Sequence, residues 1–204
     1  MNTPKDMWEA RYADDAYVYG TEPNDFLVAA TQGLSPGRAL CLADGEGRNG
    51  VYLATLGFEV TSVDLTHAGL DKANRLATAK DVSITAIVAD LADFDLGEDR
   101  WDLIVSIFAH MPPTIRRPLH GRIAPALASD GRFVLEAYTP DQVDSDTGGP
   151  SDPTLTMTLA GLTDELTGLS IIEGREIVRP VIEGPGHTGD GAVVQVVATQ
   201  HLPA

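Results

Sequence analysis

The sequence predicts a doubly wound α/β fold with a mainly parallel sheet of seven strands. Strand-like and helix-like segments alternate through most of the 204 residues, and this alternation builds parallel sheets with helices on both faces. Two long β-branched segments late in the chain predict a β-hairpin, which should add one antiparallel strand near the edge of the sheet. The predicted strands are residues 39–43, 58–63, 83–89, 101–108, 132–138, 169–182 and 192–201.

Composition limits the kind of protein and partner. The formal net charge is −16, with 43% hydrophobic and 22% charged residues. Such a chain can bury one core, so we expect a single domain over residues 1–204, with a helical lid segment at 1–35 and the core at 36–204. The negative charge argues against nucleic acid or an anionic membrane as partner, because both need a positive surface. We expect a small-molecule partner and a monomer or weak homodimer.

Cysteine usage and hydropathy narrow the class further. The single cysteine, Cys41, lies in an apolar segment, which excludes a disulfide framework and a zinc cluster, and no metal site is expected. Residues 1–6 lack an apolar signal segment, and no run approaches the ~18 apolar residues of a membrane span. We therefore expect a cytoplasmic protein.

Residues 38–50 organise the chain. They read as a buried strand and a glycine-rich turn, followed by a helix over about residues 48–56. Asn49 could start this helix and Gly57 could end it. The turn, Gly45-Glu46-Gly47-Arg48-Asn49-Gly50, matches the G-x-G-x-x-G pattern of nucleotide-binding βα units.

The charge of this turn separates two cofactor classes. The second strand ends on Asp64, at roughly the ~20-residue spacing of that pattern, and its carboxylate can accept both hydroxyls of a ribose. A pyrophosphate needs a helix N-terminus free of nearby anions, yet the turn carries Asp44 and Glu46. Two carboxylates suit a cation, which favours S-adenosylmethionine, with its sulfonium and ammonium groups, over NAD. A nicotinamide-dependent oxidoreductase is the alternative that the glycine pattern permits.

The third strand ends on a further acid. A helix capped by Thr66 should run to about Ala79, and the strand after it ends on Asp90. Asp90 could accept a hydrogen bond from an adenine amino group, and Leu91 could pack on the ring. Ligands of doubly wound sheets bind at the carboxyl ends of the strands, where these residues fall. Alternatively, Asp90 only caps the turn of residues 90–95.

The segment before the first strand has no place in the sheet. A helix over residues 5–13 puts Trp8, Arg11 and Tyr12 on one face. An aromatic, turn-rich stretch follows, and then a second helix over residues 25–31. We expect this segment to cover one edge of the sheet, either as a lid over the cofactor pocket or only by packing its aromatic side chains.

The second half of the chain completes the sheet. The strand over residues 101–108 is nearly continuously apolar, which is typical of a central strand covered on both faces. A helix over residues 113–127 leads to the fifth strand, and a short helix near residues 159–166 precedes the hairpin. Residues 139–156 between them are loop-like, and a structureless stretch of that length is usually functional or mobile.

Four polar side chains from three separate segments could border one acceptor pocket. If the fourth and fifth strands and the hairpin all end on the cofactor's side, His110, Tyr138 and His187 meet there, with Glu136 nearby. His110 is the first candidate for catalysis. Plain structural roles are the alternatives: His110 could cap the next helix, Glu136 could pair with an arginine, and His187 could be a solvated loop residue.

These residues resemble a known family, the class I S-adenosylmethionine-dependent methyltransferases, and within it the small tellurite-resistance and thiopurine-type branch. The matching features cover nearly the whole chain: Trp8, Tyr19-Gly20, Pro23, the loop from Asp44 to Asn49, Asp64, Asp90-Leu91, residues 107–110 and residues 136–138. Two positions depart from the family pattern. Ala43 stands where glycine is usual. Cys41 stands where many members have an acid that contacts the methionine ammonium, and Asp44 or Glu46 could make this contact instead.

The resemblance implies a Rossmann-like methyltransferase that uses S-adenosylmethionine to methylate a small molecule. A soft sulfur, selenium or tellurium acceptor needs no strong base, whereas a hydroxyl or amine needs one. A regulatory protein that binds the cofactor without turnover is a further alternative. The residues expected at the cofactor are Arg11, Tyr19, Asp44, Gly45, Glu46, Gly47, Asn49, Asp64, Leu65, Asp90, Leu91 and Ser106, and those expected in catalysis are His110, Tyr138 and His187.

Overall fold

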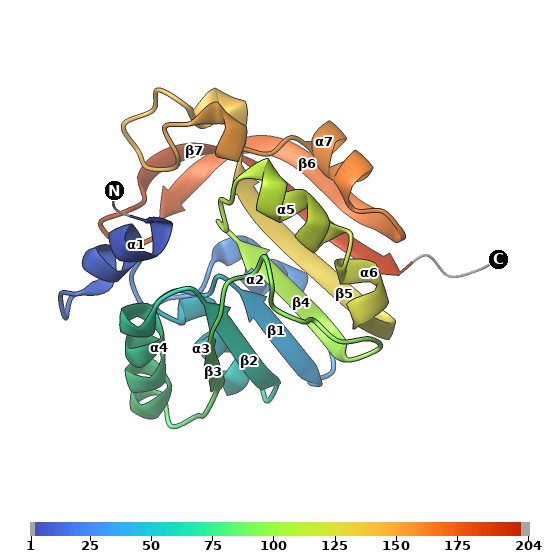
Figure 1. Ribbon diagram of the computed structural model, residues 1–204, viewed down its shortest axis with the longest axis horizontal. Helices are drawn as coiled ribbons and strands as arrows, with labels where there is room; N and C mark the ends of the chain where they lie inside the picture. Colours follow the sequence, from blue (N-terminus) through green and yellow to red (C-terminus); the bar gives the residue numbers. More distant parts are fainter. Residues whose placement is uncertain (1–2, 201–204) are drawn as a thin grey trace.

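The computed structural model describes residues 3–200, in which seven strands form one sheet of order β3-β2-β1-β4-β5-β7-β6 (Figure 1). Strands β1 to β5 run parallel to one another, and β7 runs antiparallel to β5 and β6. This confirms the predicted fold class. The strands are β1 (Arg38–Leu42), β2 (Glu59–Asp64), β3 (Thr85–Val88), β4 (Trp101–Ile107), β5 (Leu127–Tyr138), β6 (Leu169–Ile182) and β7 (Thr188–Gln200). The last predicted strand included His201, which lies outside the described residues.

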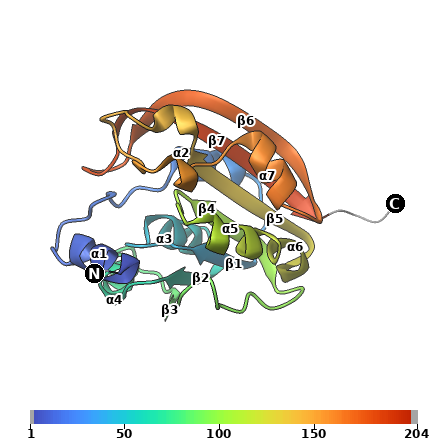
Figure 2. The same cartoon turned by 45° about the horizontal axis from the view of Figure 1, so that its top comes forward.

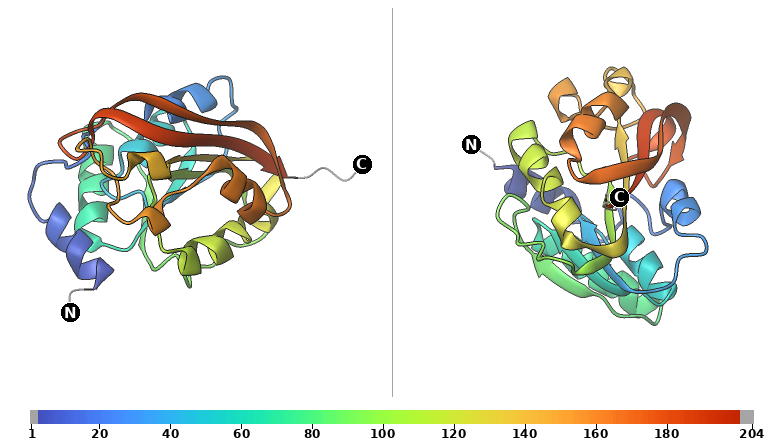
Figure 3. Two further views of the ribbon diagram at one scale, coloured as in Figure 1. Left: turned by 90° about the horizontal axis from the view of Figure 1, so that it is seen from above. Right: turned by 90° about the vertical axis from the view of Figure 1, so that its right-hand side faces the viewer.

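Helices cover both faces of the sheet (Figure 3). Leu40 and Leu42 point into one core with α5, α6 and α7, whereas Ala39 and Cys41 point into a second core with α2 and α3. The helices are α1 (Pro4–Tyr12), α2 (Asp25–Ala30), α3 (Arg48–Thr55), α4 (His67–Ala79), α5 (Pro113–His120), α6 (Ile123–Ala126) and α7 (Leu159–Glu165). Figure 2 shows β6 and β7 as a long curved hairpin with α7 beside it. None of the helices in residues 3–200 is long and apolar enough to cross a membrane.

Local signals gave two correct helix boundaries and one wrong one. Thr66 caps α4 through its side chain, and Gly57 follows the end of α3 at a φ of 93°, both as predicted. Asn49 does not start α3, because the cap position belongs to Gly47 in a left-handed conformation. The Asn49 side chain instead accepts the backbone amide of Asn24.

The second half differs from its predicted boundaries in several places, one of which is the start of β7 at Thr188 instead of residue 192. The predicted helix over residues 113–127 is divided into α5 and α6, and Pro118 and Pro125 each lack an amide that a continuous helix would use. Strand β5 begins at Leu127, earlier than predicted. Within residues 139–156, two 3-10 turns form, η1 (Pro140–Gln142) and η2 (Pro153–Leu155), each with proline at its start.

The segment before β1 does not lie along an edge of the sheet, so that prediction is wrong. The edge strands are β3 and β6, whereas α1 packs against α4 and α2 lies on the same face as α3. The Glu9 carboxylate accepts the backbone amides of His67 and Ala68 at the start of α4, at 2.9 and 3.0 Å. These amides have no partner within the helix, and Glu9 therefore draws α1 to the carboxyl ends of the strands.

Candidate active site

The glycine turn and His110 follow β1 and β4, the two neighbouring strands between which the strand order reverses. In doubly wound sheets, this switch point is where ligands bind. Both strands end there in a residue with left-handed backbone, Ala43 at a φ of 51° and Phe108 at a φ of 52°. Such a conformation costs an L-residue roughly 1–2 kcal/mol. It explains why the family that this loop resembles usually has glycine at the position of Ala43.

The glycines of the turn allow the surrounding chain to approach closely. A Cβ atom on Gly45 would lie 2.8 Å from the Tyr12 hydroxyl, and one on Gly47 would overlap Ala73 of α4. A Cβ atom on Gly50 would overlap the side chain of Asp44. The G-x-G-x-x-G spacing is therefore required by contacts within this protein.

Asp64 ends β2 beside the glycine turn. One carboxylate oxygen accepts the amide of Gly45 at 2.9 Å, and the other accepts the amide and hydroxyl of Thr66. Burial raises the pKa of Asp64 above its ordinary value, while these hydrogen bonds oppose the shift. The contact that we predicted between this carboxylate and a ribose stays a prediction.

Asp44 lies at the N-terminus of α3. Its carboxylate accepts the Gly50 amide at 3.2 Å and the Ser62 hydroxyl at 2.6 Å. Burial raises the pKa of Asp44 to about 6, against the opposing effect of the Ser62 and Gly50 hydrogen bonds. An anion thus already occupies the helix terminus at which a pyrophosphate would bind.

Glu46 anchors a segment that we call the N-terminal strap, residues 16–20. Its carboxylate accepts the amides of Val18 and Tyr19 and forms a buried ion pair with Lys72 at 2.7 Å. Farther along the strap, the Val18 carbonyl accepts the amide of Gly186 in the β6–β7 loop. The strap therefore joins the glycine turn to the hairpin. The predicted contact of Glu46 with the cofactor stays a prediction.

The other predicted cofactor residues lie in different surroundings. Leu91 and Ser106 are buried and Leu65 is half-buried, all near the carboxyl ends of their strands. Asp90 is exposed, and its carboxylate accepts the amide of Ala92, which is the turn-capping role given above as its alternative. Arg11 donates to the Tyr19 hydroxyl at 3.0 Å. The cofactor roles of these residues remain untested.

Five rings from four segments form one group, which we call the aromatic cluster: Tyr19, Phe108, His110, Tyr138 and His187. The Phe108 ring lies 4.6 Å from that of Tyr138 and 4.8 Å from that of His187, centroid to centroid. Tyr19 covers His187 at 4.7 Å. The structure thus brings together His110, Tyr138 and His187, which were predicted to border one pocket.

His110 has partners on both ring nitrogens. Nδ1 lies 3.0 Å from the Leu155 carbonyl, and Nε2 accepts the Tyr138 amide at 3.4 Å. Burial lowers the pKa of His110 to about 4. A neutral imidazole with both nitrogens engaged is poorly placed to take a proton, so His110, our first candidate, is not supported as the general base. It does not cap α5 either, since Pro112 holds that position.

Tyr138 and His187 are both buried. The Tyr138 hydroxyl has no hydrogen-bond partner among the described residues, and burial, with Glu183 and Glu136 nearby, raises its pKa well above the ordinary value. His187 is not a solvated loop residue, because 5% of it is exposed and its Nδ1 lies 3.3 Å from a Glu183 carboxylate oxygen. The Tyr138 hydroxyl and the Nε2 atom of His187 are thus the polar atoms of the cluster that no described residue engages.

A buried polar network beneath the cluster was largely missed from the sequence. Glu136 pairs with Arg179 at 2.6 Å, which confirms the alternative given for Glu136. Asn24 at the start of α2 donates to both Glu136 and Glu183. The remaining members are Arg48, which pairs with Glu183, and Gln195, which donates to Glu136. A glutamate and a glutamine inside predicted apolar strands were the available signal.

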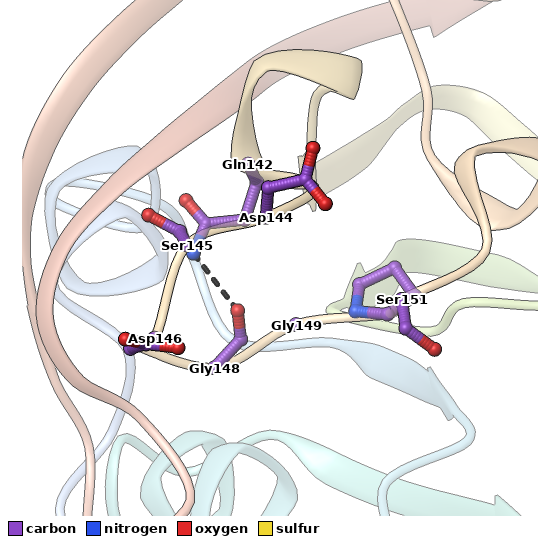
Figure 4. Close-up of a pocket in the computed structure, with 8 residues that line it drawn as sticks. Gln142, Asp144, Ser145, Asp146, Gly148, Gly149 and Ser151 are labelled. Atoms are coloured by element: carbon purple, nitrogen blue, oxygen red, sulfur yellow. Dashed lines mark hydrogen bonds between the residues drawn. The ribbon is translucent and has the colours of Figure 1, made fainter.

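The loop over residues 139–156 closes the cluster from outside. A Cβ atom on Gly149 would lie 2.9 Å from the Tyr138 ring, and one on Gly148 would lie 3.0 Å from His187. Gln142 holds the loop by donating to the Gly148 carbonyl and accepting the Ala192 amide. A hollow of about 360 Å³ opens within the loop (Figure 4), but its lining contains none of the glycine-turn residues. It is therefore distinct from the predicted cofactor site.

Comparison with known proteins places this arrangement in a family. Residues 7–117, more than half of the chain, match the family "Tellurite resistance protein TehB". The probable S-adenosyl-L-methionine-dependent methyltransferase TehB of Haemophilus influenzae (strain 10810) is 32% identical over 85 residues. These residues are 42% of this chain and 29% of that protein, so the match spans less than a third of the relative's length.

Solved structures share the fold over nearly the full chain. One described as "Conversion of a Disulfide Bond into a Thioacetal Group during Echinomycin Biosynthesis" superposes with a TM-score of 0.79 at 19% identity, covering 99% of this chain and 93% of that one. The glycopeptide N-methyltransferase MtfA, complexed with S-adenosyl-L-methionine, gives 0.64 at 17% identity, covering 99% of each. At these identities, the likeness shows the methyltransferase fold alone. The family match shows more: this chain belongs to the TehB family.

Proposed function

We propose that the protein transfers a methyl group from S-adenosylmethionine to a small-molecule acceptor. Support comes from membership of the TehB family, the methyltransferase fold and the acidic side chains at the switch point. We also propose that the segment before β1 acts as the lid of this site, since the N-terminal strap contacts both the glycine turn and the hairpin loop.

The observation that carries the proposal is the position of Asp44. Its carboxylate accepts a first-turn amide of α3, where the pyrophosphate of NAD would need a free helix N-terminus. A cationic ligand gains from the same carboxylate, and S-adenosylmethionine brings both a sulfonium and an ammonium group. The site therefore favours the sulfur nucleotide over the nicotinamide cofactor.

The residues present fit this cofactor. Asp64 has a buried carboxylate at the end of β2. Oδ1 already accepts two hydrogen bonds from Thr66, whereas Oδ2, which accepts the Gly45 amide, has a lone pair for a ribose hydroxyl. When bound, S-adenosylmethionine supplies a methyl group already activated by its sulfonium. The task of the chain is then to align the acceptor and exclude water. The strap and the 139–156 loop enclose the aromatic cluster and serve that exclusion.

We propose the aromatic cluster as the acceptor site, and a soft sulfur, selenium or tellurium atom as the atom methylated. Phe108 and Tyr138 offer polarisable ring surfaces, which make favourable contacts with sulfur. The Tyr138 hydroxyl, which is buried without a partner among residues 3–200, gives the acceptor a hydrogen-bond donor. The cluster is small and enclosed, which favours a small molecule.

Calorimetry and turnover together test the proposal. S-adenosylhomocysteine should stabilise the folded protein by about 2.7 kcal/mol at a hundredfold excess over its dissociation constant, whereas NAD should not. Methyl transfer is then measured with a panel of thiols, selenite and small phenols. Stabilisation by NAD alone would contradict the proposal. Binding of the sulfur nucleotide without turnover of any acceptor would favour the regulatory alternative.

A further inference from the structure

The loop between β6 and β7 places a carboxylate directly behind the cluster's histidine. We infer that Glu183 is a positioning residue that fixes His187 with its proton on Nδ1, so that Nε2 removes a proton from an acceptor that arrives neutral. This inference rests on the proposed methyl transfer and adds to it the class of acceptor, a molecule with an ionisable X–H group such as an unactivated thiol.

The tautomer follows from the state of Glu183. Burial raises the pKa of Glu183, but the hydrogen bond from His187 and the charge of Arg48 outweigh burial and hold it at about 2. The ionised carboxylate can only accept hydrogen bonds, so the His187 Nδ1, 3.3 Å from its oxygen, must carry the hydrogen. In the neutral ring, Nε2 then has its lone pair free.

The surroundings of Nε2 suit a reacting group. Nδ1 is the ring nitrogen held by the protein, and Nε2 makes no hydrogen bond to any of the described residues. The His187 ring lies between Tyr19 and Phe108, and its edge meets Tyr138 at a centroid distance of 5.4 Å. One free acceptor, His187 Nε2, and one free donor, the Tyr138 hydroxyl, thus belong to one cluster. An X–H group of an acceptor can donate its hydrogen to His187 Nε2 and accept a hydrogen bond from the Tyr138 hydroxyl.

The charge of the network favours a neutral acceptor over an oxyanion. Arg48 pairs with Glu183, and Arg179 pairs with Glu136 and approaches Glu183 at 3.5 Å. Arg179 also lies 3.9 Å from Asp25, so two cations face three carboxylates, and the network has no positive charge left with which to neutralise an anion. The titratable and charged groups that face His187 or its carboxylate are Tyr19, Arg48, His110, Tyr138, Arg179 and Glu183.

The transfer balances with groups already in the site. A lone pair of the acceptor atom forms the bond to the methyl carbon, and the methyl–sulfonium bond breaks with its electron pair left on sulfur. The X–H proton passes to His187 Nε2 and then to water. The resulting imidazolium is stabilised by Glu183, which remains a carboxylate throughout.

The first test is spectroscopic and needs no turnover. Nitrogen-15 NMR of the ring of His187, assigned by comparison with His187→Gln, should show a protonated Nδ1 and an unprotonated Nε2 at a pH above the titration of the ring. In Glu183→Gln, the Nε2–H tautomer should become populated, because an amide can donate to Nδ1. A dominant Nε2–H form in the wild-type protein would overturn the inference, even if Glu183→Gln fails to fold.

The second test compares two thiols as methyl acceptors, benzyl mercaptan, which keeps its proton at neutral pH, and 4-nitrothiophenol, which is largely ionised. His187→Gln should slow methylation of the first by on the order of 10²–10⁴-fold and of the second by less than about 10-fold. Glu183→Gln should show the same selectivity for the protonated thiol, with a steeper dependence of kcat on pH. Glu173→Gln, an exposed glutamate on β6, is the matched control.

The outcomes separate this inference from the proposed function. Equal losses with both thiols would mean that His187 only positions the acceptor, which would overturn the inference and leave methyl transfer standing. Methylation of neither thiol would count against the proposed function, while the NMR tautomer would still decide the assignment of Glu183.

Discussion

The proposed cofactor half of the site, around Asp44 and Asp64, and the proposed acceptor half, the aromatic cluster with the polar network beneath it, are held by different kinds of contact. In the cofactor half, carboxylates accept backbone amides at shorter sequence separations: Asp64 accepts those of Gly45 and Thr66, 19 and 2 residues away, and Asp44 accepts that of Gly50, 6 residues away. In the acceptor half, carboxylates accept side chains from distant segments, as Glu183 does from Asn24 and Arg48.

Because of this difference, removal of a carboxylate should have different consequences in the two halves. A backbone amide stays in place when a carboxylate is removed, and water or a ligand can replace the acceptor. A buried arginine that loses its carboxylate keeps its charge in an apolar environment, which is costly. The buried ion pair of Glu46 and Lys72 at the glycine turn is the exception. Apart from it, the acceptor half should govern stability, and the cofactor half should govern ligand affinity.

The largest expected effect is on the stability of the acceptor half. Glu136→Ala leaves Arg179, Gln195 and Asn24 without their shared acceptor, so we expect a loss of about 3–5 kcal/mol in the free energy of unfolding, measured with urea. Asp15→Ala, which breaks an exposed ion pair with Arg75, should change it by less than about 1 kcal/mol. If both variants lost a similar free energy of unfolding, the buried network would contribute no more to stability than an exposed ion pair does.

The next effect concerns cofactor affinity. Asp64→Asn removes one of two charged acceptor oxygens, so S-adenosylhomocysteine should bind more weakly by roughly 1.5–3 kcal/mol in titration calorimetry. Because Asp64 also accepts from Gly45 and Thr66, some stability is lost too, but less than in Glu136→Ala. Asp71→Asn, at an exposed site on α4, is the control. Unchanged affinity in a folded variant would move the ribose site elsewhere.

The third expected effect is at Asp44, where removal of the charge should raise the free energy of unfolding and weaken cofactor binding. Its pKa of about 6 in the folded protein exceeds the ordinary 3.8, so the folded state holds this proton more tightly than the unfolded chain. The free energy of unfolding therefore falls as pH rises from about 4 to about 6, and the loss is complete above that. Asp44→Asn should be more stable than wild type by about 1–3 kcal/mol near pH 8 and no more stable near pH 3.5.

The same Asp44→Asn variant should bind S-adenosylhomocysteine more weakly, because it lacks the carboxylate that we propose for the cationic end of the ligand. Urea unfolding across this pH range and calorimetry at neutral pH check the two halves of the prediction. A variant that is less stable than wild type at every pH would show that the hydrogen bonds of Asp44 outweigh its burial.

The smallest effect is at Ala43. Glycine relieves the left-handed strain, about 1–2 kcal/mol, but adds about 0.5–1 kcal/mol of unfolded-state entropy. Ala43→Gly should therefore raise the free energy of unfolding by about 0.5–1 kcal/mol, whereas Ala54→Gly inside α3 should lower it by about 1 kcal/mol. Thermal unfolding of both variants gives the comparison, and a destabilised Ala43→Gly would mean that the strain is absorbed elsewhere.

The same division explains what the sequence could predict. The cap at Thr66, the end of α3 at Gly57 and the position of Asp64 depend on neighbours a few residues away, which the sequence displays directly. The meeting of His110, Tyr138 and His187 followed from the strand order.

Other features depend on contacts that no local pattern encodes. Asn24 reaches Glu136 and Glu183 across 112 and 159 residues, and these contacts depend on the register of the hairpin. Likewise, the partners of the His110 nitrogens are backbone atoms of Leu155 and Tyr138, whose positions follow from the path of the 139–156 loop. Neither could be derived before the fold was known.

The contact between Asn24 and Glu183 also has a consequence for the order of assembly. Contacts of such sequence separation form late, because a long loop must close before they contribute. During synthesis, the β1–β4 half can pair its strands while the final hairpin is still inside the ribosome. The side-chain amide of Asn24, at the start of α2, then stays hydrated until β6 and β7 have been synthesised and have folded. A nascent chain should thus form the proposed cofactor half before it forms the proposed acceptor half.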